Sequence, residues 1–182
     1  NLNFIDQSGI FYYIAGEEIL KGNAENLGIA GGPIGGPLLH ATLGNLLGDA
    51  FTAGKIISLI SGTGIVFLSY FITKNLFDKK VALVTQLFFA VSAKIAFLSV
   101  MVLNEIAPLF FIFVSLYFIT KKQKTIPDFL LIGFFLAISF WIRYQSVIIL
   151  IAFLIFLLIF ERKKILKFKQ SLLTLFPFVL TA

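Results

Sequence analysis

Long apolar runs follow one another along the chain, separated by short polar or charged breaks. The runs cover approximately residues 51–73, 81–100, 103–120, 126–142, 144–160 and the stretch from 166 onward. Each is close to the roughly 20 residues that a helix needs to cross a bilayer. Apolar residues fill these runs without alternating with polar ones, which favours helices over strands. The pattern predicts an all-α, polytopic transmembrane helical bundle over residues 51–182, with five complete spans and a sixth that is cut.

Basic residues gather in the breaks between these runs. The three clusters are Lys74, Lys79 and Lys80; Lys121, Lys122 and Lys124; and Arg162, Lys163, Lys164, Lys167 and Lys169. Because the connections are short, successive spans are antiparallel, and clusters at every second connection share one side of the membrane. The positive-inside rule identifies that side as the cytoplasm. We therefore expect residues 1–50 and the turns near 105 and 143 on the extracytoplasmic side of a plasma membrane.

Residues 1–50 are moderately apolar and rich in Gly and Pro, and two short amphipathic helices are predicted in them. Ser8 can cap the first helix, which runs to about Lys21 and stops at Gly22. Pro37 can open the second helix, whose apolar face is expected to hold Leu39, Leu43, Leu46 and Leu47, with Gly48 at its end. We interpret the segment as a long external loop whose helices lie on the outer membrane surface.

The stretch between the two predicted helices, residues 28–36, is rich in glycine and indicates a flexible loop. A nucleotide-binding loop would follow a strand and end in Gly-Lys-Ser or Gly-Lys-Thr. Neither feature is present in the sequence. We therefore do not expect a nucleotide to bind here.

The composition agrees with a membrane protein. Hydrophobic residues make up 59% of the chain and charged residues 13%, and the mean hydropathy is +0.99. A soluble domain carries about twice that charged share. Because the sequence has no cysteine, disulfides and thiolate nucleophiles are excluded, and its single histidine leaves little room for a histidine-rich metal centre. The chain starts without Met and stops within an apolar run, so we expect a fragment.

The net charge of +6 comes from basic clusters on one predicted side of the membrane, and we interpret it as an indication of topology. Most of the acidic residues fall on the predicted outer side, opposite the basic clusters: Asp6, Glu17, Glu18, Glu25, Asp49 and Glu105. Basic residues interleaved with aromatic stacking platforms, which nucleic-acid-binding proteins use, do not occur in the sequence. We therefore expect a lipid bilayer around the spans and no nucleic acid as a partner.

Four ionisable residues lie outside the basic clusters at the predicted outer level. At about 1.5 Å per helical residue, Glu105 and Arg143 lie roughly 24 Å and roughly 28 Å from the cytoplasmic cluster between them. Because the hydrocarbon core is about 30 Å thick, both sit at or just below the outer surface. The same count places Lys94 there, and Asp6 belongs to the outer segment. Two carboxylates and two cations are thus expected to converge.

Each candidate also has a structural explanation. Asp6 could cap a turn, Arg143 could be an interfacial anchor, and Lys94 could extend its ammonium to the surface. His40 could be a hydrogen-bonded polar residue of the second short helix. Glu105 is harder to explain structurally, because an ionisable group within an apolar span is costly and usually functional.

An ordered series of residues resembles a known family. The series is Asp6-Gln7, Tyr12-Tyr13, Gly22, Pro37-Leu38-Leu39, Gly48, Ala53-Gly54-Lys55-Ile56-Ile57-Ser58 and the Asn-Glu pair at 104–105 after a serine-containing turn. It resembles the C-type membrane glycosyltransferases, which include protein O-mannosyltransferases and aminoarabinose transferases. The resemblance covers nearly the whole chain as a pattern of spacing, and it implies further spans before Asp6 and after the last run.

The resemblance implies transfer of a sugar from a polyprenyl-phosphate or polyprenyl-diphosphate carrier to an acceptor on the external face. Asp6 would be the general base that deprotonates the acceptor. Glu105 would orient the acceptor or hold a divalent cation such as Mg²⁺ or Mn²⁺. Gln7 stands where many relatives carry a second acid, which leaves metal dependence open. The acceptor, whether protein, lipid or glycan, is not identified.

The same resemblance assigns the substrate-binding residues. Arg143, together with Lys94, would stabilise the departing phosphate, because a fixed cation suits a leaving group that needs no proton. Tyr12 and His40 are also assigned to substrate binding.

The alternative is a membrane protein without enzymatic activity, such as a transporter or scaffold fragment. Transport sites lie near the bilayer midplane on broken helices. Here the midplane positions of the predicted spans are almost wholly apolar, and the polar groups gather at one surface. This distribution favours chemistry on a lipid-borne substrate.

Overall fold

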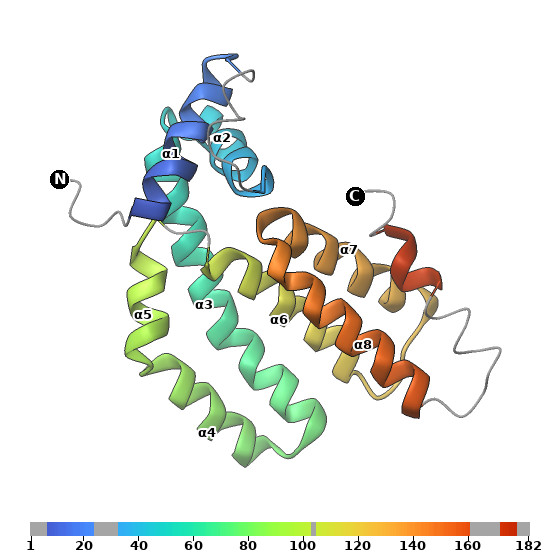
Figure 1. Ribbon diagram of the computed structural model, residues 1–182. Coiled ribbons are helices and arrows are strands. Elements are labelled where there is room, and N and C mark those ends of the chain that lie inside the picture. Colours follow the sequence, from blue (N-terminus) through green and yellow to red (C-terminus); the bar gives the residue numbers. More distant parts are fainter. Residues whose placement is uncertain (1–6, 24–32, 103–104, 161–171, 178–182) are drawn as a thin grey trace.

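The computed structural model describes residues 7–23, 33–102, 105–160 and 172–177 (Figure 1). Within these ranges every regular element is a helix, so the predicted all-α class is confirmed. The elements are α1 (Gln7–Leu20), α2 (Gly35–Leu47), α3 (Ala50–Leu76), α4 (Lys79–Ala90), α5 (Ala93–Val100), α6 (Ile106–Thr120), α7 (Ile126–Ile142), the 3-10 turn η2 (Tyr144–Ser146) and α8 (Val147–Phe160). A short helical segment at 172–177 packs on α7.

The long helix α3 lies at the centre of the arrangement. The helices α4 and α5 lie along one side of it and α6 along the other, and α7 and α8 follow beyond α6 (Figure 1). The helices α1 and α2 pack against each other and against the first turns of α3, and α2 also contacts α7. The two short helices of the first 50 residues therefore sit together at one end of the bundle.

Among the described residues, α3 is the one helix that is long and apolar enough to cross a membrane by itself. Its 27 residues extend about 40 Å, more than the roughly 30 Å of the hydrocarbon core. Asp49 starts the helix, because its carboxylate accepts the backbone N–H of Thr52 at 2.7 Å. Further along, Gly62 lies directly against Ser99 of α5. The missing side chain lets these two helices approach closely.

We predicted one continuous helix over the run at 81–100. The structure instead has two helices, bent by 54° at a break. Val91 closes α4, while Ser92 takes an extended backbone conformation and its hydroxyl accepts the N–H of Ile95 at 3.5 Å. A serine cap therefore restarts the helix in a new direction. Counted together, α4 and α5 make a second helix of spanning length, whereas α6, α7 and the stretch 144–156 are apolar but shorter. The number of five complete spans stays a prediction.

Buried serines fix α6 against α7. The hydroxyl of Ser115 donates to the carbonyl of Ile132 at 3.3 Å. The hydroxyl of Ser139 donates to the carbonyl of Pro108 at 2.9 Å and lies 2.7 Å from the hydroxyl of Ser146. Such polar links between apolar helices set their register where hydrophobic packing alone is unspecific. They place the end of α7 beside the start of α6.

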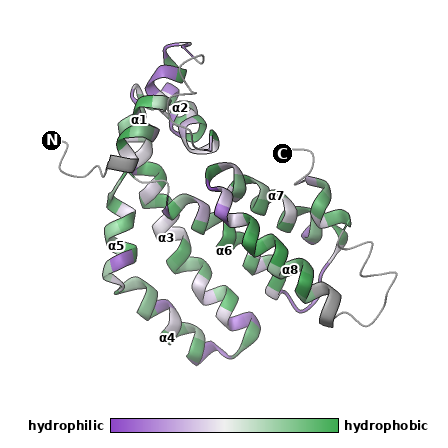
Figure 2. Cartoon of the chain, viewed as in Figure 1, coloured by the Kyte–Doolittle hydropathy of each residue, from purple (hydrophilic) through white to green (hydrophobic). Residues whose placement is uncertain are grey.

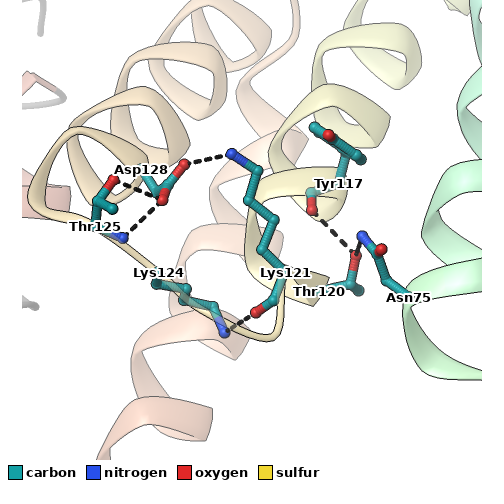
Figure 3. Close-up of polar contacts among 7 residues, drawn as sticks. All are labelled: Asn75, Tyr117, Thr120, Lys121, Lys124, Thr125 and Asp128. Atoms are coloured by element: carbon teal, nitrogen blue, oxygen red, sulfur yellow. Dashed lines mark hydrogen bonds and ion pairs between the residues drawn. The ribbon is translucent and has the colours of Figure 1, made fainter.

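The opposite ends of α3 and α6 also meet, through the polar contacts drawn in Figure 3. The side-chain amide of Asn75 donates to the hydroxyl of Thr120 at 3.4 Å. Asp128 accepts the ammonium of Lys121 and the backbone N–H of Thr125, both at 2.7 Å, which closes the turn between α6 and α7. The first two basic clusters therefore share one side of the bundle, as predicted. The third cluster lies outside the described residues.

The predicted ends of the two short helices are confirmed. Gly22 and Gly48 have φ values of 80° and 93°, in the left-handed region that favours glycine after a helix. The predicted starts are slightly wrong. The first helix begins one residue before Ser8, so Ser8 lies inside it, and the second begins two residues before Pro37.

The helix α2 packs on the bundle with a side other than the predicted leucine face. The residues that α2 buries are Gly35, Gly36, Pro37, His40, Ala41 and Gly44, whereas Leu46 is 80% exposed. A methyl group on Gly44 would lie 3.1 Å from the backbone of Ala50. Small residues permit this close approach of α2 to α3, which leucines would prevent. Gly35 and Gly36 also belong to α2 and not to the loop predicted at 28–36.

Large apolar side chains are exposed on α4 and α8. In Figure 2 the described part of α8 is coloured mostly as hydrophobic, and α4 mixes hydrophobic and hydrophilic residues. The exposed residues are Val81, Leu83, Val84, Leu87 and Phe88 on α4, and Ile148, Ile151, Ile155 and Phe156 on α8. A surface this apolar is unusual in contact with water. It fits contact with lipid on both flanks of the bundle. The placement of α1 and α2 on the outer membrane surface stays a prediction.

Candidate active site

Glu105 and Arg143 form an ion pair, with 3.2 Å between Oε1 of Glu105 and Nη1 of Arg143. Glu105 immediately precedes α6, and Arg143 immediately follows α7. Because these helices are antiparallel and held in register by buried serines, the two side chains meet at one end of the bundle. The predicted convergence of this carboxylate and this guanidinium is confirmed.

The ion pair is open to its surroundings, since the side chains of Arg143 and Glu105 are 42% and 47% exposed. Ion pairs at this level of exposure contribute about 0 to 1 kcal/mol. A ligand that carries a phosphate can therefore compete with Glu105 for the guanidinium, which binds such oxygens through paired N–H donors.

An apolar cavity of about 480 Å³ lies between α2, α6 and α7. We call it the carrier cavity, and its lining residues are Gly35, Leu38, Leu39, Thr42, Phe111, Ala137, Ile138, Trp141 and Ile142. Its last residue along the chain, Ile142, directly precedes Arg143. The cavity therefore offers space for an apolar chain next to a cation.

The carrier cavity depends on a close approach of α2 to α7. A methyl group built on Gly35 would lie 2.6 Å from the carbonyl carbon and oxygen of Trp141. At this position only glycine lets the start of α2 rest on the backbone at the end of α7. The contact places α2 as one wall of the cavity and fixes the end of α7 just before Arg143.

This contact makes Gly35→Ala a specific test of the cavity. We expect the added methyl to push α2 away from α7, to destabilise the protein by about 1 to 3 kcal/mol, and to weaken binding of any ligand in the cavity. Thermal unfolding of the purified protein measures the first effect. The control is Leu46→Ala on the exposed side of the same helix, and equal midpoints for the two variants would contradict the assigned contact.

His40 is buried at the junction of α1, α2 and α3, with 2% of its surface exposed. Its ring atoms lie 3.1 and 3.4 Å from where a methyl group on Gly54 would be. Its Nδ1 has no hydrogen-bond partner within the described part of the chain, so the alternative of a fully hydrogen-bonded histidine does not hold for this atom. Burial lowers the pKa of His40 to about 4, and the ring is neutral at pH 7. Its assignment to substrate binding stays a prediction.

The other candidates are not brought to the ion pair by any contact between described residues. Lys94 lies in the first turn of α5 and is exposed, and Tyr12 is half-buried on α1. Asp6 lies outside the described residues. Within those residues, no three His, Asp or Glu side chains gather as metal ligands would. The possible Mg²⁺ or Mn²⁺ site formed by Asp6 and Glu105 therefore stays a prediction.

Glu17 has a role that sequence analysis missed. Its Oε1 accepts the backbone N–H of Ala50 at 2.7 Å, at the start of α3. Asp49 caps the same helix, and the hydrogen bonds from Thr52 hold the pKa of Asp49 below its usual value. Two carboxylates thus accept hydrogen bonds from free N–H groups at the start of α3, and their negative charge stabilises the positive end of the helix dipole. In the sequence, Glu17 belongs to the acidic residues of the predicted outer side, and these were interpreted only as an indication of topology.

Lys55 belongs to the series that carries the resemblance, but it was not predicted as a site residue. Its ammonium lies 4.3 Å from the centre of the Phe51 ring, one turn earlier in α3, which is a favourable cation–π distance. Lys55 also lines a groove of about 390 Å³ with Leu59, Ser99 and Val100, between α3 and α5. In the sequence, Lys55 is the basic residue near the start of the first predicted span.

The sequence profile of the dolichyl-phosphate-mannose-protein mannosyltransferases matches residues 32–182, most of the chain. The chain belongs to this family. Searches of curated proteins and of solved structures give no match. Membership of the mannosyltransferase family confirms the resemblance to C-type glycosyltransferases and indicates a membrane glycosyltransferase. The matched part of the chain, residues 32–182, includes Glu105, Arg143 and every residue that lines the carrier cavity, and it begins after Asp6 and Tyr12.

Proposed function

We propose that the protein transfers a sugar from a polyprenyl-phosphate carrier to an acceptor on the extracytoplasmic face of the membrane. The observation that carries this proposal is that Arg143, paired with Glu105, directly follows Ile142, a residue that lines an apolar cavity. A lipid-linked sugar phosphate needs both features, because its prenyl chain is apolar and its phosphate is anionic. Family membership supports the choice of sugar transfer over other reactions of lipid phosphates.

The carrier cavity would hold the end of the prenyl chain that adjoins the phosphate. Its walls come almost entirely from apolar side chains and from the small residues Gly35 and Ala137. Burying a prenyl segment there is favourable by about 25 cal/mol per Å² of apolar surface. With the chain seated, the phosphate comes level with Arg143, one residue beyond the cavity wall.

Arg143 would stabilise the charge that develops on the phosphate as its bond to the sugar breaks. The guanidinium can donate two parallel N–H bonds to phosphate oxygens, and it stays charged at every relevant pH. Glu105 would hold the guanidinium in place until the phosphate arrives. The contact of 3.2 Å gives this carboxylate a positioning role that does not require a metal ion.

Asp6 would complete the reaction as the general base. It would take the proton of the acceptor nucleophile while the acceptor attacks the anomeric carbon from the side opposite the phosphate. One bond forms as the carbon–oxygen bond to the phosphate breaks, so the configuration inverts, by analogy with inverting hydrolases. Asp6 directly precedes α1 in the sequence, and Glu17 of α1 accepts a hydrogen bond from the start of α3. This position supports the proposed role of Asp6.

The test is transfer of radiolabelled mannose from polyprenyl-phosphate mannose by the full-length protein in membrane vesicles. We expect label to leave the carrier lipid and to appear in an acceptor. The variant Thr42→Trp, which fills the carrier cavity from an exposed position of α2, should raise the donor KM about tenfold with little change in kcat, since it removes ground-state binding. Asn45→Trp is the matched control, exposed on the same helix outside the cavity.

Two results would contradict the proposal. Absence of transfer with every polyprenyl-phosphate sugar tested would remove the enzymatic assignment. An equal donor KM for the Thr42 and Asn45 variants would show that the prenyl chain binds elsewhere.

A further inference from the structure

A second, smaller cavity adjoins the carrier cavity, and Trp141 lines both. It has a volume of about 170 Å³ and is lined by Ile34, Phe140, Trp141 and Tyr144. We call it the aromatic pocket. The rings of Phe140 and Tyr144 are 5.3 Å apart and inclined by 50°, so they form two walls that are not parallel. Its surface is more polar than that of the carrier cavity.

Trp141 lines both cavities, so they adjoin each other. In the chain, Arg143 stands between Ile142, which lines the carrier cavity, and Tyr144, which lines the aromatic pocket. A donor consists of an apolar chain, a phosphate and a sugar, and with its chain in the carrier cavity and its phosphate at Arg143 the sugar can reach the adjoining aromatic pocket.

We propose that the aromatic pocket binds the single sugar of the donor, with Tyr144 as a residue that distinguishes sugar-linked from sugar-free carrier. This inference rests on the proposed function, because it assumes that the carrier cavity receives the prenyl chain. It adds a subsite and assigns it to one pyranose ring.

The chemistry of the pocket suits a pyranose. A sugar ring presents C–H bonds on its faces and hydroxyls around its rim. The C–H faces pack against the negative faces of aromatic rings, and such contacts contribute about as much as pairs of aromatic side chains. Trp141 and Tyr144 each also carry a hydrogen-bond donor, the indole N–H and the phenol O–H. The volume of about 170 Å³ is close to that of one monosaccharide and too small for an oligosaccharide.

The competing explanation is that these aromatic residues only anchor the helix ends at the membrane surface. Trp and Tyr are enriched at that level in many membrane proteins. An anchor would affect every lipid ligand equally, whereas a sugar subsite would act only on carriers that bear a sugar. The two explanations therefore predict different binding ratios.

The experiment compares binding of polyprenyl-phosphate mannose and of sugar-free polyprenyl phosphate to the full-length protein in nanodiscs, without acceptor. We expect the wild type to prefer the sugar-linked lipid about five- to tenfold. Tyr144→Leu should remove most of this preference and leave affinity for the sugar-free lipid unchanged, while Tyr144→Phe should keep most of it. Because Tyr144 is 53% exposed, these substitutions leave the packed core intact.

Tyr70→Leu on α3, away from both cavities, is the matched control and should retain the preference. An unchanged preference in Tyr144→Leu, or an equal loss of affinity for both lipids, would overturn the sugar subsite. This readout is separate from the proposed function. If transfer is never detected but Tyr144→Leu abolishes a sugar preference, the aromatic pocket stands and the reaction fails. If transfer occurs and the preference is unaffected, only the pocket fails.

Discussion

Replacing Arg143 by methionine is expected to slow sugar transfer about 100- to 1,000-fold at saturating donor, because the departing phosphate loses its fixed positive partner. The methionine keeps the apolar stem of the side chain, so the end of α7 should pack as before. Single-turnover transfer from polyprenyl-phosphate mannose measures the effect directly on the chemical step.

Two further variants make the Arg143 result specific. Arg143→Lys retains the charge but loses the planar pair of donors, and its rate should fall between those of the wild type and the methionine variant. Lys122→Met, in the exposed turn between α6 and α7, removes a positive charge at the other end of the bundle and should leave the rate unchanged. If Arg143→Met raised only the donor KM, the guanidinium would bind the phosphate without stabilising its departure.

Replacing Asp6 by asparagine is expected to reduce kcat about 100- to 10,000-fold, the range for loss of a general base. The donor KM should change little, since the carrier cavity is formed by other elements.

The matched control for Asp6 is Asp49→Asn. It makes the same chemical change in a carboxylate that caps α3. Because asparagine also caps helices well, the expected cost is only the lost charge at the helix start, about 0.3 to 1 kcal/mol, with nearly normal transfer. Similar rates for the Asp6 and Asp49 variants would show that Asp6 has no direct part in the reaction.

The convergence of Glu105 and Arg143 could be predicted because it depends on few quantities. Apolar runs separated by short breaks force antiparallel helices, and the helical rise fixes the level of each residue between its ends. Both residues flank runs whose helices begin and end within a few residues of the predicted limits. The pairing then follows from adjacency along the chain.

The cavities and the break at Val91–Ser92 could not be predicted, because they depend on packing between elements. A serine within an apolar run resembles any interfacial residue until its hydroxyl is seen to cap α5. The sequence predicted a leucine face for α2, but it did not indicate that Gly35 and Gly44 would make the close contacts of this helix with α7 and α3. The walls of the carrier cavity come from α2, α6 and α7, and hydrophobic periodicity does not encode which helices become neighbours.

The carboxylate of Glu105 is attached to the same chain as Arg143, and this attachment affects which anions can bind the guanidinium. A free anion dissolved in water must displace a partner that is always present at high local concentration. A phosphate attached to a membrane-embedded chain arrives with its own tether, because the tail seated in the adjoining cavity keeps the headgroup close. Under the proposed function, the resting pair weakens the binding of every phosphate by at most about 1 kcal/mol, and only a phosphate on a seated lipid chain has a tether that offsets this cost.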